Sequence, residues 1–365
     1  MNQYRPLKHA IVTSFKPKGG RAAYAGMSIA VCILAKDEQE SIGLCLRQLA
    51  NQSIVRAGTE VIEVLVVANG CTDDTVSVAR ASAGLFDGGR VTLKVHDLPE
   101  GGKSRAWNRT VHEFAGDAVD TFVFLDSDVT LKNDGVIANL LSRLRSDTRL
   151  AAFSGFPVKD AETKSRKSVF DRFSLFVSSR TRHLDVINGS LYVARASALR
   201  DIWLPNQIPG EDGFLNGMVS TRGFTQPADP NLVSASSEPT HYFHSHRPIE
   251  FVSHERRMIV GTMINRWLFE HFWSLKSDRP AGHLIRDWNA EDPVWIDKFV
   301  GRHAAKSNWL IPNAILFSRL KRHSGCPLWK YAASLPIALA ATVSTLPPAI
   351  LANKRLKQLG AAATW

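Results

Sequence analysis

The sequence has few cysteines, and acidic residues are absent from both of its ends. The four cysteines form no CxxC pair and no zinc-finger spacing, which excludes a disulfide framework and a structural zinc module. Residues 1–26 hold five basic and no acidic residues, and residues 298–365 hold ten basic and no acidic residues. No apolar run of signal-peptide length follows the first basic residues. We therefore expect a reduced, intracellular protein with basic ends.

The excess of positive charge does not extend over the whole chain. The net charge is +11, yet residues 27–297 hold the other 30 basic residues together with all 34 acidic ones. A nucleic-acid-binding fold needs a basic face over the folded body, so we expect no nucleic-acid partner. Basic ends around a mildly acidic body fit an anionic lipid surface better. A solvated basic tail is the plain alternative.

Apolar runs alternate with helical patterns in the first third of the chain. Short runs rich in β-branched residues predict strands at 28–35, 61–68, 90–96 and 121–125. Between them, apolar spacing predicts helices within 38–52 and 103–114. This alternation is typical of an α/β fold with a doubly wound, mostly parallel sheet. Ligands of such sheets bind at the carboxyl ends of the strands.

The run TFVFL ends in Asp126-Ser127-Asp128. Two carboxylates one residue apart at a strand end can both approach one hard cation, and Mg²⁺ or Mn²⁺ prefers such oxygen ligands. A bound metal would neutralise a diphosphate leaving group. We therefore interpret Asp126 and Asp128 as metal ligands. The alternative is a chance DxD that caps a helix.

Glu211-Asp212 follows Pro209-Gly210, which predicts the start of a helix at this acidic pair. One carboxylate is enough to take a proton from an attacking hydroxyl group. The alternative is ordinary helix chemistry, since acidic residues near a helix N-terminus stabilise it.

Several cations accompany these acids. Lys103 and Arg105 follow two glycines and can reach a phosphate. The alternative is that each is an ordinary solvated surface cation. Three histidines, His241, His244 and His246, cluster close to Arg247. Their spacing is no zinc signature, and we take His246 as the third metal ligand.

An uncharged segment lies between Lys330 and Lys354. Residues 331–353 have the length of a membrane span but contain three prolines and several hydroxyl residues. A span, a segment that lies on the membrane surface or re-enters it, and a buried hairpin all remain open. Aromatic residues crowd 267–273, as at a membrane interface or in an ordinary core. The sequence thus favours membrane attachment without fixing a topology.

Six motifs occur in an order that resembles family 2 of the inverting glycosyltransferases, which have the GT-A fold. The resemblance covers roughly Ser28 to Phe224, with the motifs ILAKDEQESIGLCLRQLANQ, EVLVVANGCTDDT, GGKSRAWN, FVFLDSD, INGSLYVARASAL and GEDGFL. It implies a nucleotide-diphospho-sugar donor, Mg²⁺ or Mn²⁺, and Asp212 as the catalytic base supported by Glu211. The expected nucleotide-sugar contacts are Ala35, Asp37, Glu38, Asn69, Lys103, Asp126 and Ser127.

Two departures from the family pattern matter. Family members often carry an aspartate that contacts the nucleotide base where Ala68 stands, so the donor base stays open. The Gln-x-x-Arg-Trp motif of the processive synthases is not matched at 254–257, which favours transfer of a single sugar. Two other functions compete with a transferase: a sugar-phosphate nucleotidyltransferase and a non-catalytic nucleotide-sugar binding protein. The first usually has a glycine-rich loop after its first strand, and AKDEQES has no glycine.

The expected organisation has four parts. Residues 1–26 form a basic arm, 27–245 the GT-A catalytic domain, 246–330 a helical acceptor-side or interfacial region, and 331–365 a membrane-associating segment with a basic tail. The expected acceptor is a glycan, lipid-linked or a precursor of a cell-envelope or extracellular polysaccharide. Because nucleotide sugars are cytoplasmic, we expect the protein at the cytoplasmic face of the inner membrane.

Overall fold

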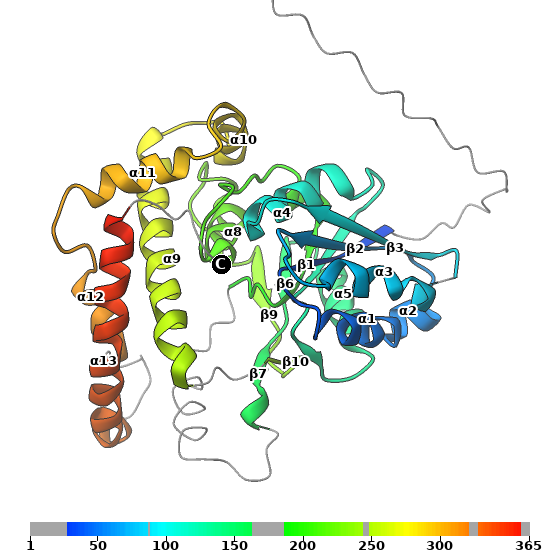
Figure 1. Ribbon diagram of the computed structural model, residues 1–365, viewed down its shortest axis with the longest axis horizontal. Helices are drawn as coiled ribbons and strands as arrows, with labels where there is room; N and C mark the ends of the chain where they lie inside the picture. The colour runs from blue at the N-terminus through cyan, green and yellow to red at the C-terminus, as the bar shows by residue number, and fades with distance from the viewer. Residues whose placement is uncertain (1–27, 87, 163–185, 244–247, 321–327, 359–365) are drawn as a thin grey trace, which may run out of the picture.

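The computed structural model describes residues 28–86, 88–162, 186–243, 248–320 and 328–358. A twisted sheet with helices on both sides forms the first two thirds of the chain, and a group of helices lies beside it (Figure 1). The predicted arm at 1–26 and the predicted metal ligand His246 lie outside the described residues.

The main sheet has seven strands in the order β3-β2-β1-β4-β8-β6-β9. Its first four strands are parallel, β8 is antiparallel to β4 and β6, and β9 is parallel to β6. The predicted α/β fold with a mostly parallel sheet is therefore confirmed. The strands are β1 (Ser28–Ala35), β2 (Val61–Asn69), β3 (Val91–Leu98), β4 (Thr121–Leu125), β6 (Ala152–Ser154), β8 (Leu191–Arg195) and β9 (Val233–Ala235).

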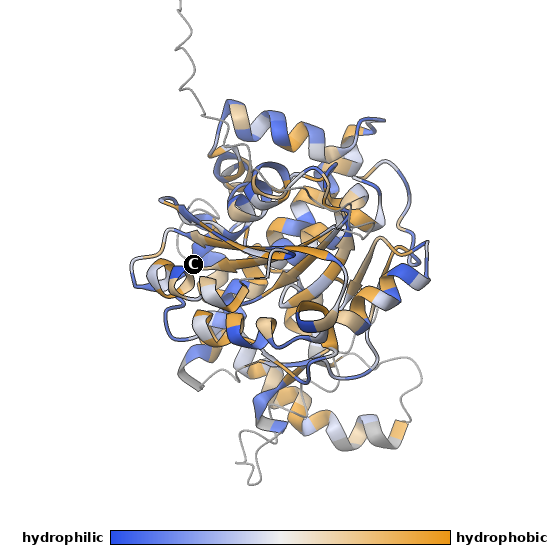
Figure 2. Ribbon diagram, turned by 90° about the vertical axis from the view of Figure 1, so that its right-hand side faces the viewer, coloured by the Kyte–Doolittle hydropathy of each residue, from blue (hydrophilic) through white to orange (hydrophobic). Residues whose placement is uncertain are grey.

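The central strands are buried on both faces, which is why they read as continuous apolar runs. Alternate residues of β1 belong to two different cores: Ile29 and Val31 pack on one side of the sheet, and Ala30 and Cys32 on the other. Figure 2 shows the strands as a hydrophobic layer inside more polar helices and loops. The sheet is thus a rigid platform for the residues at its strand ends.

A small second sheet has the strand order β5-β10-β7. This sheet consists of β5 (Thr130–Leu131), β7 (Pro157–Lys159) and β10 (His241–Phe243). The neighbouring strands β6 and β7 therefore belong to different sheets. The helices of this part are α1 (Ile42–Ala50), α2 (Ser53–Ala57), α3 (Thr75–Ala81), η1 (Ala83–Phe86), α4 (Lys103–Arg109), η2 (Thr110–Phe114), α5 (Val136–Ser146), η3 (Asp160–Glu162), α7 (Ala196–Leu199) and α8 (Glu211–Ser220).

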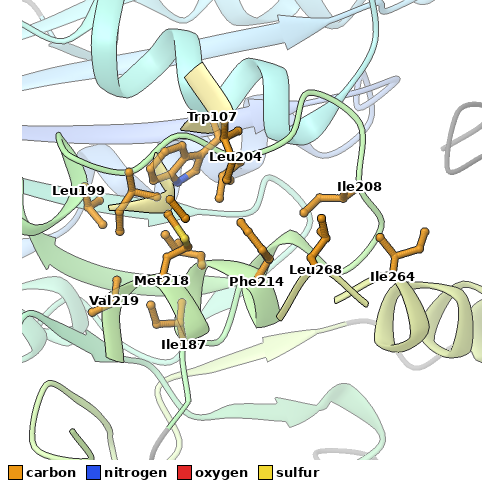
Figure 3. Packing of buried hydrophobic residues seen from close by; sticks show 14 of the residues in the cluster. Trp107, Ile187, Leu199, Leu204, Ile208, Phe214, Met218, Val219, Ile264 and Leu268 are labelled. Atoms are coloured by element: carbon orange, nitrogen blue, oxygen red, sulfur yellow. The ribbon is translucent and has the colours of Figure 1, made fainter. Parts of the chain in front are cut away.

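A long helix, α9 (Pro248–Leu275), joins the C-terminal helices to the sheet domain. Its Ile264 and Leu268 pack with Phe214 of α8 and with Ile208 in one continuous core (Figure 3). The remaining helices are α10 (Ala281–Glu291), α11 (Trp295–Ala304), α12 (Asn313–Leu316), η4 (Ser318–Leu320) and α13 (Leu328–Lys357). Helices α9 and α13 lie side by side, with α10 and α11 at one end of the pair (Figure 1).

The uncharged segment predicted at 331–353 is part of α13. Three prolines lie inside this helix, at Pro336, Pro347 and Pro348. In the described part of the chain, Ser334–Lys357 is the one stretch that is long and apolar enough to cross a membrane by length and composition.

Candidate active site

The carboxyl ends of β1, β2 and β4 and the start of α8 meet at one edge of the sheet. A cavity lies there, and its lining includes the polar side chains of Lys103, Asp126, Glu211 and Asp212. The lining also includes apolar and aromatic residues such as Leu34, Trp107, Phe124 and Tyr192. The sheet therefore brings together acidic pairs that lie far apart in the sequence.

Lys103 connects the two predicted acidic pairs. Its Nζ lies 3.0 Å from Oδ1 of Asp126 and 3.2 Å from Oε1 of Glu211. Burial opposes the charge of this lysine, but Asp126 and Glu211 outweigh burial and raise the pKa of Lys103 well above its usual range. Lys103 is therefore a permanent cation inside the site rather than the surface cation of the alternative interpretation.

The DxD segment directly follows β4. Burial raises the pKa of Asp126, although the Lys103 ammonium group opposes this effect. Asp128 is exposed, and Ser127 is buried and hydrogen-bonds to Glu38. Burial raises the pKa of Glu38 as well, and Asp128 and Asp126 add to it. Three carboxylates thus lie close enough to repel one another.

Glu211 and Asp212 form the first turn of α8, as predicted from the sequence. Gly210 has φ +76°, a left-handed conformation that favours glycine and turns the chain into the helix. Burial raises the pKa of Asp212, and the neighbouring charge of Glu211 adds to it. A carboxylate with a raised pKa is a better proton acceptor, so Asp212 suits the role of a general base.

Gly189 leaves room for Asp212. A Cβ atom at this position would lie 3.3 Å from Cβ and 3.4 Å from Oδ2 of Asp212. Gly189 was not among the predicted site residues, because its role depends on Asp212, a neighbour 23 positions away in the sequence.

Comparisons with known proteins bear on the family and the fold. The family model described as glycosyl transferase family 2 matches residues 30–203. The chain contains a glycosyl transferase family 2 domain. A search of curated proteins finds no match to the chain.

Solved structures are also similar to the chain, and the first of the two below shares its fold. A mannosyltransferase from Pyrobaculum calidifontis, in complex with GDP-Man and Mn²⁺, is 17% identical with a TM-score of 0.50, over 90% of this chain and 86% of its own. Glucosyl-3-phosphoglycerate synthase from Mycobacterium tuberculosis, in complex with phosphoglyceric acid, is 19% identical with a TM-score of 0.47, over 69% of this chain and 86% of its own. The predicted GT-A fold is confirmed.

Two polar residues of the family motifs hold loops of the glycosyltransferase in place. Asn69 is buried, where its Nδ2 donates to the carbonyl oxygen of Ala35 and its Oδ1 accepts from the backbone N–H of Gly102. Asn108 makes two hydrogen bonds with the backbone of Leu204. The predicted nucleotide contacts of Ala35 and Asn69 stay predictions, and the structure gives Asn69 a positioning role.

Asp37 lies in a separate loop network at the ends of β1 and β2. A carboxylate oxygen of Asp37, the sulfur of Cys71 and a carboxylate oxygen of Asp73 all lie within 4.8 Å of one another. The two carboxylates already accept hydrogen bonds from backbone N–H groups, Asp37 from Thr72 and Asp73 from Gln39. The hydrogen bond from Thr72, helped by the neighbouring Lys36, lowers the pKa of Asp37, so this carboxylate stays ionised.

The donor set at β4 fits a hard divalent cation. Charge repulsion links Asp126 to the carboxylates of Glu38, Asp128, Glu211 and Asp212, and Lys103 is ion-paired with Asp126 and Glu211. A diphosphate would be repelled by this excess of negative charge unless a cation accompanied it. Oxygen ligands of this kind are those that Mg²⁺ and Mn²⁺ prefer.

Helix α9 contacts the loop that precedes Glu211. This contact was not predicted from the sequence. Nδ2 of Asn265 donates to the carbonyl oxygen of Gly210 at 2.8 Å. A Cβ on Gly261 would lie only 2.6 Å from the carbonyl oxygen of Pro209. The sequence did contain one signal for this contact. Gly261 is an isolated glycine in a long helical stretch, and such a glycine often marks the close approach of another backbone segment.

His241 is a buried neighbour of the site, not a solvent-facing ligand. Its Nε2 lies 2.8 Å from the hydroxyl oxygen of Ser190, and its Nδ1 lies 2.9 Å from that of Thr240. Burial lowers its pKa to about 4, so the ring is neutral at pH 7. The backbone of Ser190 in turn accepts from the N–H of Asp126. His241 therefore helps to fix the start of the DxD segment.

Proposed function

We propose that the chain is a metal-dependent, inverting glycosyltransferase that uses a nucleotide-diphosphate sugar. The observation that carries this proposal is the ion-paired Lys103 between Asp126 and Glu211, with the half-buried Asp212 beside them. The mannosyltransferase of similar fold is described with GDP-Man and Mn²⁺, the class of donor and metal that we propose.

In this proposal Asp212 takes the proton of the acceptor hydroxyl group. The acceptor oxygen then attacks the anomeric carbon from the side opposite to the diphosphate, the bond from that carbon to the diphosphate oxygen breaks, and the configuration inverts. Asp126 and Asp128 would hold a divalent cation, whose Lewis acidity would neutralise the leaving diphosphate. Lys103 keeps its charge throughout and orients Asp126 and Glu211.

The acceptor is proposed to be a lipid-linked or cell-envelope glycan at the cytoplasmic face of the membrane. The support is the ten basic and no acidic residues of 298–365 and the apolar helix α13. Anionic lipid headgroups attract such basic segments by about 1 kcal/mol per residue near the surface.

A screen of nucleotide sugars by thermal shift, with Mg²⁺ or Mn²⁺ present, tests the proposal. We expect one donor to raise Tm in a metal-dependent way and to be turned over with release of a nucleoside diphosphate. Release of pyrophosphate from a nucleoside triphosphate and a sugar phosphate would instead identify a nucleotidyltransferase. Donor binding without any turnover would favour a non-catalytic binding protein.

A further inference from the structure

Helix α13 has an arrangement of side chains opposite to that of a soluble amphipathic helix. Between Ser334 and Ala352 its buried residues are mostly small or hydroxyl residues, and its exposed side carries bulky apolar ones. The buried residues are Ser334, Ala338, Ala341, Thr342, Thr345, Pro348, Ala349 and Ala352, and beyond this stretch Leu356 is also buried. The exposed ones are Ile337, Leu339, Val343, Leu346, Ile350 and Leu351.

The exposed residues form a continuous stripe rather than scattered positions. Leu339, Val343, Leu346 and Ile350 are spaced by four, three and four residues, which places them on one face of the helix. Val343 is 63% exposed and Ile350 is 58% exposed. Contiguous apolar surface of this kind marks an interaction site.

The charges near this stripe favour a lipid surface, rather than a second copy of the chain, as its binding partner. Lys354 and Lys357 are exposed one and two turns after Ile350, and no acidic residue follows Asp297 in the sequence. Two copies joined through α13 would bring these like charges together. An anionic membrane surface complements both the stripe and the lysines.

The opposite side of α13 is held by the protein. The helix packs along α9, and Oδ1 of Asn353 accepts from the backbone N–H of Leu310 while its Nδ2 donates to the carbonyl oxygen of Asn308. Helix α9 cannot enter a bilayer beside it, because Arg257 and Arg266 are exposed and its other face belongs to the domain core. A spanning α13 would have to leave α9 and present its hydroxyl residues to lipid.

We infer that α13 lies in the plane of an anionic membrane surface, with the stripe of Leu339, Val343, Leu346 and Ile350 inserted and its small-residue side kept on α9. This inference rests on the proposed membrane-proximal function and adds the contact surface and the topology. It also gives the catalytic domain a fixed orientation, since α9 connects α13 to the loop before Glu211.

The first experiment is flotation of the full-length protein with phosphatidylglycerol vesicles, with phosphatidylcholine vesicles as the neutral control. We expect binding to the anionic vesicles. The double variant Val343→Asp/Ile350→Asp should partition at least tenfold more weakly, at unchanged Tm because both residues are exposed. Leu44→Asp, which changes an exposed leucine on α1, is the matched control and should bind normally. Equal binding of wild type and double variant would overturn the inference.

The second experiment measures depth, using fluorophores attached to Leu339→Cys or Ile350→Cys in a chain in which serine replaces Cys71 and Cys326. Lipid-borne quenchers should report the same shallow depth for both labels, about 5–10 Å into the interface. A spanning helix would separate the two depths by about 16 Å, since eleven residues rise about 1.5 Å each. That gradient, or concentration-dependent dimers without vesicles, would overturn the inference. Donor binding, measured in the same samples, reports separately on the proposed function.

Discussion

Replacement of Gly189 by alanine is the most specific perturbation of the proposed base. The added Cβ would approach Cβ of Asp212 to 3.3 Å, Oδ2 to 3.4 Å and Cγ to 3.6 Å. Ordinary contacts between carbon atoms are about 3.5–4.0 Å, so Asp212 must move by a few tenths of an ångström. Gly189 has no left-handed φ, and alanine therefore adds no backbone strain.

The expected loss is small but measurable. A misplacement of about 1 Å at a catalytic group can cost about 10²-fold in rate. A shift of a few tenths of an ångström should therefore lower kcat by about 3- to 10-fold, or about 0.7–1.4 kcal/mol in the activation barrier. The KM for the donor and Tm should stay near the wild-type values, because neither the metal ligands nor the core is disturbed.

The assay is steady-state release of nucleoside diphosphate at saturating metal. Gly88→Ala is the matched control, because a Cβ there meets no atom within 4 Å. In an Asp212→Asn background, Gly189→Ala should have little further effect, since both changes act through the same carboxylate. A kcat of Gly189→Ala equal to wild type, or a full additional loss in the Asp212→Asn background, would refute the placement of Asp212 as the base.

Three further predictions concern metal, proton affinity and stability. Asp128→Ala should abolish binding of Mn²⁺ with donor at unchanged Tm, whereas Cys71→Ser should bind Mn²⁺ normally; the reverse result in Mn²⁺ titrations would move the metal to the Asp37 loop. Glu211→Gln should shift the acidic limb of the kcat–pH profile to lower pH, because loss of a neighbouring negative charge lowers the pKa of Asp212; an unchanged limb would contradict this coupling. His241 is neutral in the fold, with a pKa of about 4 against 6.5 in the unfolded chain. Stability from this residue is present above pH 6.5 and is lost as pH falls toward 4, by about 3 kcal/mol at about 1.36 kcal/mol per pH unit. Urea unfolding of His241→Gln should show a correspondingly weaker decline between pH 7 and pH 4, and a decline as steep as that of wild type would contradict this account.

Local patterns in the sequence were sufficient to predict the four parallel strands β1 to β4 and the residues that follow them. The apolar runs that became β1 and β4 carry their own signal, because strands buried on both faces need few polar residues. The helix at Glu211 was likewise predictable from Pro209-Gly210 and the acidic first turn.

The contacts that assemble the site could not be predicted in this way. Lys103 and Glu211 are 108 positions apart, and only the folded sheet brings their charges to 3.2 Å. The space that Gly189 leaves and the hydrogen bond from Asn265 to Gly210 depend in the same way on tertiary packing. The apolar stripe on the exposed side of α13 was also not predictable. An uncharged helix has no alternation of polar and apolar residues that would show which side is buried, and that side is known only from its packing on α9.

The central claim is that Asp126 and Asp128 hold the donor with its metal while Asp212 performs the proton transfer. Binding and turnover of the donor in three proteins test it most directly: wild type, Asp128→Ala and Asp212→Asn. We predict metal-dependent binding and turnover for wild type, loss of both for Asp128→Ala, and wild-type donor affinity with a loss of turnover of at least about 10²-fold for Asp212→Asn. Near-normal turnover of Asp212→Asn, or full activity of wild type in the presence of a chelator, would contradict the account.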